Sequence, residues 1–194
     1  MKEESNDNLS PQLTEIPNRF HQDGEGRPFD QCTFCEQNLA EVGPYLIEKS
    51  MKVNRDTGRH YTVYEYAICG SCSRKKMEAM SKESVANIQR YMSENLNLDN
   101  FLSSAKTFED KIGRCPITGQ AINDLEEYNL VGQFVGDQMI LGQFPMAVDA
   151  AVGEGMQDLL SEQTKKEFDD FMDTVNGIPP ELRSLFKTKR PIFA

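Results

Sequence analysis

The sequence CTFC at residues 32–35 and the sequence CGSC at residues 69–72 decide the fold of this chain. In each, two residues separate a pair of cysteines, and residues 36–68 between the pairs are enough for one hairpin. The short spacer lets both sulfurs of a pair face one ion, and two pairs supply the four thiolates of a tetrahedral Zn²⁺ site. The cysteines that the spacing predicts to bind one structural zinc ion are Cys32, Cys35, Cys69 and Cys72.

The same cysteines could instead form paired disulfides or a redox dithiol. A thioredoxin-like motif would open a helix after a strand, whereas Cys32 follows a polar, Gly-rich segment. Two pairs together favour a metal, and four cysteines leave no open coordination position for water. We therefore expect a structural ion and no catalysis at this site.

The residues between and after the pairs predict how the cysteines are arranged. Residues 45–53 and 61–68 are rich in β-branched and aromatic side chains and flank a turn at 54–58. Residues 73–80 have helix-forming composition. Cys69 is thus expected at the end of a strand and Cys72 in the first turn of a helix.

This order of knuckle, hairpin, knuckle and helix resembles treble-clef and zinc-ribbon type zinc-binding proteins. It is similar in arrangement to the zinc-binding domain of Clp-type unfoldases. The resemblance covers residues 30–92 and implies a fold and a zinc ion, but no activity.

Composition and charge restrict the class of protein. The chain has 194 residues, and its formal net charge is −10. No apolar run reaches the about 18 residues needed to cross a bilayer, and the first 20 residues lack a basic start followed by an apolar stretch. We expect a cytoplasmic protein without a membrane partner, in which reduced cysteines bind metal.

The charge is unevenly distributed along the chain. The net charge is −4 over residues 1–31, +1 over residues 32–95 and −7 over residues 96–194. The acidic last segment disfavours contact with nucleic acid, because a phosphate backbone is neutralised by clustered Lys and Arg. Arg74, Lys75 and Lys76 follow the second cysteine pair and are the candidate nucleic-acid contacts, although cations at this place also offset the charge of a four-thiolate zinc site.

An internal repeat is predicted from a second, altered knuckle at Cys115-Pro116-Ile117-Thr118. A shift of 83 residues sets Cys32 on Cys115 and Tyr45 on Tyr128, and after the hairpin a shift of 80 sets Ser81 on Ser161. The four ligand positions of the second copy would be Cys115, Thr118, Asp149 and Val152. Valine cannot bind a metal, so the second copy is expected to be metal-free, with a richer apolar core in place of the ion.

The fold class predicted from these patterns is α+β, with two treble-clef-like units related by internal duplication, the first zinc-bound and the second metal-free. The expected organisation is a flexible N-terminal arm (1–28), the zinc-binding unit (29–96), a helical connector (97–112), the degenerate repeat (113–178) and a C-terminal tail (179–194).

No catalytic grouping is evident. His21 and His60 have no metal or nucleophile–base spacing, which argues against an HNH-type nuclease, and no His or basic cluster near Cys115 would activate its thiol. The sequence therefore favours a non-enzymatic structural-zinc protein that acts as a protein–protein interaction or adaptor module, with a protein partner or a second copy of the chain. The alternative is nucleic-acid binding or transcriptional regulation through the basic helix after Cys72.

Overall fold

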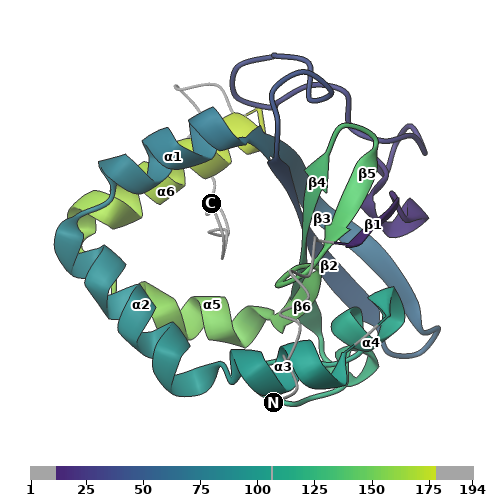
Figure 1. Cartoon of the computed structure of the whole chain (residues 1–194). Coiled ribbons are helices and arrows are strands. Elements are labelled where there is room, and N and C mark those ends of the chain that lie inside the picture. Colours follow the sequence, from purple (N-terminus) through teal and green to yellow (C-terminus); the bar gives the residue numbers. More distant parts are fainter. Residues whose placement is uncertain (1–11, 106, 178–194) are drawn as a thin grey trace, which may run out of the picture.

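A six-stranded antiparallel sheet forms the centre of the molecule (Figure 1). The computed structural model describes residues 12–105 and 107–177. The strand order is β1-β5-β4-β2-β3, and β6 also pairs with β4. The strands are β1 (Gln12–Glu15), β2 (Tyr45–Asn54), β3 (Arg59–Cys69), β4 (Glu127–Val135), β5 (Gln138–Leu141) and β6 (Met146–Asp149).

The hairpin of β2 and β3 confirms the prediction from the residues between the cysteine pairs. The side-chain oxygen of Asn54 accepts two hydrogen bonds of 3.0 Å from backbone N–H groups of the turn. Gly58 ends the turn at a φ of +65°, where a residue with a Cβ is strained. The strand pairing runs from Tyr45 opposite Cys69 to Asn54 opposite Arg59, with a register shift after Ser50.

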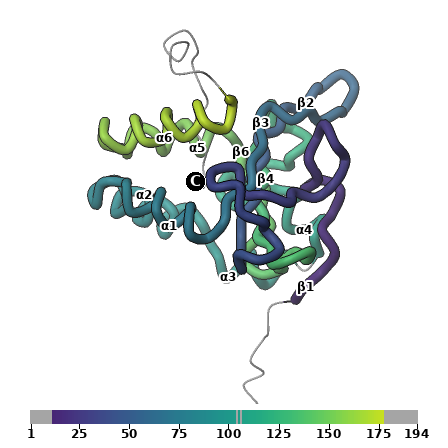
Figure 2. Tube along the Cα trace, turned by 90° about the horizontal axis from the view of Figure 1, so that it is seen from above, coloured from purple at the N-terminus to yellow at the C-terminus, as the bar shows by residue number. Residues whose placement is uncertain are grey.

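Helices cover the sheet and confirm the mixed α+β class. In Figure 1, α1, α2, α5 and α6 form an arc beside the sheet, and Figure 2 separates them into two layers, α1 with α2 and α5 with α6. The helices of the described residues are α1 (Gly70–Ala79), α2 (Lys82–Asn95), α3 (Leu98–Ser104), α4 (Phe108–Ile112), α5 (Ala150–Gln157) and α6 (Glu162–Val175), with the 3₁₀ turns η1 (Asn18–Phe20) and η2 (Ile122–Asp124).

The expectation of a flexible arm over residues 1–28 is wrong for residues 12–28. β1 pairs with β5 at the edge of the sheet, and the side chain of Phe20 in η1 is 0% exposed. The Phe20 ring lies edge-on to Phe134, with 4.9 Å between the ring centroids. One aromatic anchor and one strand pairing thus order a segment whose polar composition pointed to a solvated tail. Residues 1–11 of the arm and the tail 179–194 lie outside the described residues.

The larger of two hydrophobic core clusters joins the two halves of the chain. β2 pairs with β4 along eight positions, from Tyr45 opposite Phe134 to Lys52 opposite Glu127. The largest core cluster holds side chains from both halves, including Ile47 and Leu130, which are 0% and 1% exposed. The region of the two cysteine pairs and the region of Cys115 therefore share one sheet and one main core cluster.

The face of the sheet that meets α6 is aromatic and polar. Tyr64, Tyr66 and Ile68 pack there against Phe171 and Met172 of α6. Beside them the Glu48 carboxylate is buried, where it accepts hydrogen bonds from the Tyr66 hydroxyl (2.5 Å) and the Asn129 amide (2.8 Å). Donors from β3 and β4 thus compensate for the burial of an acidic side chain on β2.

None of the helices in the described parts of the chain combines the length and the apolar character that a membrane crossing requires.

Candidate metal centre

The first cysteine pair lies in a tight turn between β1 and β2. Cys32 N–H donates to the Gln37 carbonyl, and the Cys32 carbonyl accepts from Glu36 N–H, both at 2.9 Å. Thr33 fastens this turn to β3, because its N–H donates to the Ala67 carbonyl (2.9 Å) and its Oγ1 accepts from Ala67 N–H (3.1 Å). The turn is therefore fixed against the strand that carries the second pair.

The second pair lies at the junction of a strand and a helix. Cys69 is the last residue of β3, and it precedes α1 with extended backbone angles (φ −70°, ψ 157°). Cys72 follows in the first turn of α1. This confirms the position predicted for both cysteines from the sequence.

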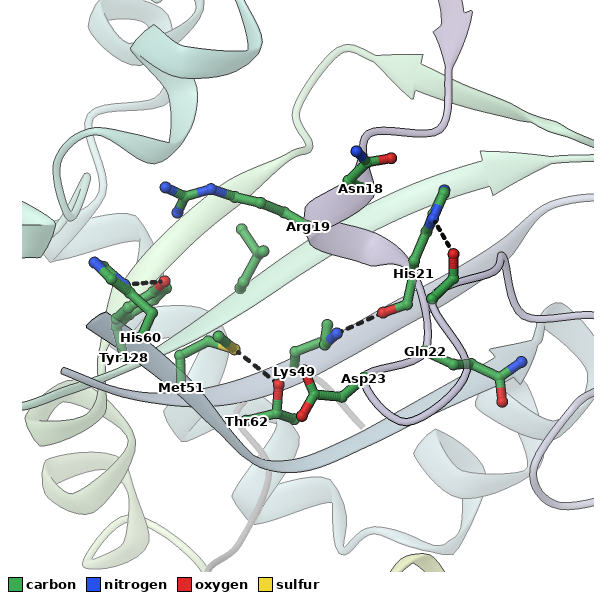
Figure 3. Close-up of a pocket in the computed structure, with 12 residues that line it drawn as sticks. Asn18, Arg19, His21, Gln22, Asp23, Lys49, Met51, His60, Thr62 and Tyr128 are labelled. Carbon is green, nitrogen blue, oxygen red and sulfur yellow. Dashed lines mark hydrogen bonds between the residues drawn. The ribbon is translucent and has the colours of Figure 1, made fainter. Parts of the chain in front are cut away.

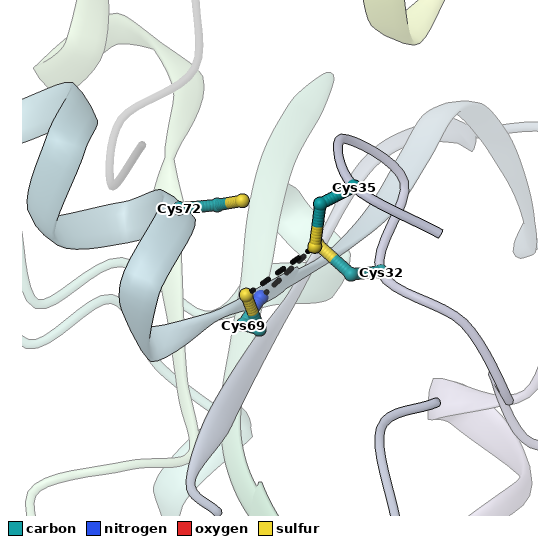
Figure 4. Close-up of side chains that lie close together, drawn as sticks. All are labelled: Cys32, Cys35, Cys69 and Cys72. Atoms are coloured by element: carbon teal, nitrogen blue, oxygen red, sulfur yellow. Dashed lines mark hydrogen bonds between the residues drawn. The ribbon is translucent and has the colours of Figure 1, made fainter. Parts of the chain in front are cut away.

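The four sulfurs converge on one point (Figure 4). All of them lie within 4.8 Å of one another, and Cys35 Sγ is 3.8 Å from Cys69 Sγ. A tetrahedral ion with metal–sulfur bonds of about 2.3 Å would hold its sulfurs about 3.8 Å apart. The cluster therefore has the size that one metal ion requires, and a four-sulfur donor set fits zinc.

Two of the four cysteines are buried, and one sulfur accepts a hydrogen bond from the backbone. Cys32 and Cys69 are 1% and 0% exposed, and Cys69 N–H donates to Cys32 Sγ at 3.4 Å. Burial raises the pKa of Cys72, as do its hydrogen bonds to Cys35 and Cys69. Burial and neighbouring thiols thus oppose ionisation of Cys72, and a divalent cation bound by the four sulfurs would relieve that cost by stabilising the thiolate. The five cysteines of the chain are free thiols in the structure, as metal binding requires.

The aromatic residue inside the first pair contacts a helix from the far end of the chain. Phe34 stacks on Phe171 of α6, with 4.4 Å between the ring centroids, and lies 6.0 Å from the Tyr66 ring. No pattern in the sequence indicated that α6 covers the cysteine turn, because the two segments are far apart in the chain. The metal centre is therefore part of the packing between the two halves.

Arg74, Lys75 and Lys76 do not form one exposed basic patch. Lys76 Nζ donates to the Glu167 carbonyl at 2.8 Å and lies over the Phe171 ring, 3.8 Å from its centroid. Burial lowers the pKa of Lys76 to about 8, against the opposing effect of Glu167 and Asp170. Arg74 and Lys75 are exposed. The grouping of all three as nucleic-acid contacts is not supported, because the third cation packs on α6.

The second knuckle has the same backbone hydrogen bonds without a metal-ligand set. Cys115 N–H donates to Gln120, Gly119 N–H donates to the Cys115 carbonyl, and Asp149 N–H donates to Cys115 Sγ at 3.4 Å. Cys115 and Val152 are 1% and 4% exposed. Over the described ranges, the four-cysteine set is the one group of three or more ligand side chains with its donor atoms close together.

Comparisons with protein-family models, with curated proteins and with solved structures found no match.

Proposed function

We propose that this chain is a zinc-stabilised protein-interaction module without catalytic activity, in which Cys32, Cys35, Cys69 and Cys72 bind one structural Zn²⁺. The sulfur separations and the burial of two of the cysteines support the metal. The order of cysteine turn, hairpin and ligand-bearing helix supports a treble-clef assignment for the first unit, residues 29–96.

A structural role follows from the donor set. Four cysteine sulfurs complete a tetrahedral zinc shell, so neither water nor substrate has a coordination position. The ion would link the turn at Cys32 to the junction of β3 and α1, and it would hold Phe34 against α6. Zinc would thus stabilise the end of the hairpin and the contact between the two halves.

Internal duplication is the second part of the proposal, with residues 113–178 as a metal-free copy. Glu48 and Val131, which the shift of 83 residues relates, lie opposite each other in the pairing of β2 with β4. Antiparallel pairing at equivalent positions is what a twofold relation between two units would give. The isolated bridges Gln31 to Asn38 and Arg114 to Ala121 obey the same shift and support the relation.

The open edge of β3 is the observation that carries the interaction function. β3 is the last strand in the sheet order, and among the described residues it pairs only with β2. Tyr61 and Val63 on this strand are 49% and 46% exposed. Away from Ala67, whose backbone is bonded to Thr33, this strand edge with apolar side chains suits an extended segment of a protein partner, which would add as a further strand.

Site-specific crosslinking tests this function. A photoreactive phenylalanine at position 61 should crosslink one discrete partner in the cells that naturally produce this protein. The additional substitution Val63→Lys should abolish this crosslinked adduct. The same photoreactive residue at Leu102, an exposed apolar side chain on α3, is the matched control. Equal crosslinking from positions 61 and 102 would refute the β3 edge as the interface. The mass of the adduct separates a different protein from a second copy of this chain.

A further inference from the structure

A cavity of about 520 Å³ lies on the face of the sheet opposite α6, between the sheet and the N-terminal segment (Figure 3). Its floor includes Met51 and Leu130, and η1 and the loop after it form its wall. The volume is within the range of small-molecule sites. His21 and His60, the two histidines of the chain, both line it.

A buried ion pair holds the wall of this cavity in place. Lys49, whose side chain is 4% exposed, donates from Nζ to the His21 carbonyl at 2.6 Å and lies 2.8 Å from Glu65 Oε2. Glu65 Oε1 accepts a hydrogen bond of 2.9 Å from Asp23 N–H. The β2 and β3 side chains therefore fix the backbone of the loop at two points, and the cavity is a built feature of the fold.

Three side chains with hydrogen-bonding groups meet at one end of the cavity. His60 Nδ1 is 2.9 Å from the Tyr128 hydroxyl, and the Arg19 side chain extends toward both, as Figure 3 shows. Burial lowers the pKa of His60 and the charge of Arg19 lowers it further. A neutral imidazole and a phenol, hydrogen-bonded to each other, thus lie beside a guanidinium and place polar groups around its positive charge.

The charges of the lining favour an anion. Arg19 has no ion pair among residues 12–105 and 107–177, whereas the charge of Lys49 is compensated by Glu65. Among the described residues of the lining, Asp23 is the one carboxylate, against the charged side chains of Arg19 and Lys49. This balance contrasts with the net charge of −10 for the whole chain.

We propose that this cavity is a binding site for a small molecule that carries an oxyanion, a carboxylate or a phosphate. Arg19 is the charged contact, His60 and Tyr128 are the hydrogen-bonding contacts, and Met51 and Leu130 contact the apolar part of the ligand. The site is distinct from the metal centre and from the β3 edge, so this proposal does not depend on the proposed function.

The histidines allow a selective test. Ring ¹⁵N signals of histidine-labelled protein come from His21 and His60 alone, so they report on this cavity. Inorganic phosphate and acetate are titrated separately, at constant pH and with chloride keeping the ionic strength constant. Saturable shifts of the His60 signal with phosphate would indicate a phosphate-bearing ligand, and saturable shifts with acetate would indicate a carboxylate.

Two arginine variants make this test decisive. Arg19→Gln should weaken the binding of whichever anion saturates by about tenfold or more, because a charge-assisted contact is lost. Arg74→Gln, an exposed arginine on α1 outside the cavity, should leave the binding unchanged. Linear shifts that do not saturate with either anion, or equal binding by Arg19→Gln and the unaltered protein, would overturn the proposal. The backbone amide spectrum of Arg19→Gln checks that the fold is retained.

Discussion

Gly132 shows how closely one residue is constrained in this fold. It lies in β4 below the Phe20 ring, and a Cβ at this position would be 2.6 Å from Phe20 Cζ and 2.7 Å from Phe134 Cζ. Both rings are 0% exposed, so neither can turn away into solvent. The absence of a side chain at Gly132 thus allows the N-terminal segment to pack on the sheet.

Gly132→Ala should therefore lower the free energy of unfolding by about 1–3 kcal/mol, because the added methyl overpacks a closed site. Gly155→Ala in α5 is the control, since no atom lies within 4 Å of its added Cβ. It should raise stability by up to about 1 kcal/mol, as alanine is the better helix former. Urea denaturation measures both, and an unchanged midpoint for Gly132→Ala would contradict the packing of Phe20 described above.

Lys76 should make stability depend on pH. Its pKa is lowered to about 8 in the folded protein from a usual value of 10.5. Between these two pH values the unfolded chain binds more protons at this side chain than the folded protein does, so its contribution to stability increases as the pH rises.

The stability of the unaltered protein relative to Lys76→Met should accordingly increase from pH 8 to pH 10.5, the interval between the two pKa values. Urea denaturation of both proteins at several pH values measures the difference, in which groups common to the two cancel. A difference that stays constant or decreases over this interval would show that Lys76 is not held in an unfavourable environment for its charge.

At the scale of elements, four hydroxyl side chains join the start of α2 to the start of α6. Ser81 Oγ accepts from Ser84 N–H at the start of α2, and Ser161 Oγ accepts from Thr164 N–H at the start of α6. The two caps also bind each other, since Ser81 N–H donates to Thr164 Oγ1 and Ser161 N–H donates to Ser84 Oγ. The sequence comparison related Ser81 to Ser161, but it did not indicate their mutual contact.

Ser161→Ala should destabilise the protein by about 1–2 kcal/mol, because it removes a helix cap and a partner of a buried hydroxyl cluster. Ser93→Ala, at an exposed position inside α2, should have little effect. Thermal unfolding of the two variants distinguishes them. Equal unfolding temperatures would mean that the hydroxyl cluster contributes nothing to the joint.

At the scale of the whole molecule, local patterns in the sequence predicted the parts better than their assembly. The cysteine spacing predicted the sulfur cluster, and the β-branched and aromatic residues on both sides of the turn at 54–58 predicted the first hairpin, because neighbouring residues determine both. The pairing of β2 with β4, the anchoring of Phe20 and the stacking of Phe34 on α6 join distant segments. Such contacts depend on three-dimensional complementarity, which one sequence does not display. The cavity around His60 was missed for the same reason.

Removal of zinc should destabilise the protein as a single unit. One sheet and one main core cluster extend across both halves of the chain. A strong zinc chelator should therefore lower the unfolding temperature in one cooperative transition. Hydrogen exchange locates the effect. Retained amide protection in β4 and α6, with protection lost in β2 and β3, would show two independent units.

The number of zinc ions per chain tests the central claim most directly. Elemental analysis of the purified protein should find one zinc, lost in Cys69→Ser and retained in Cys115→Ser. Two zinc ions would contradict the metal-free second copy, and the absence of zinc from the unaltered protein would contradict the four-cysteine metal centre.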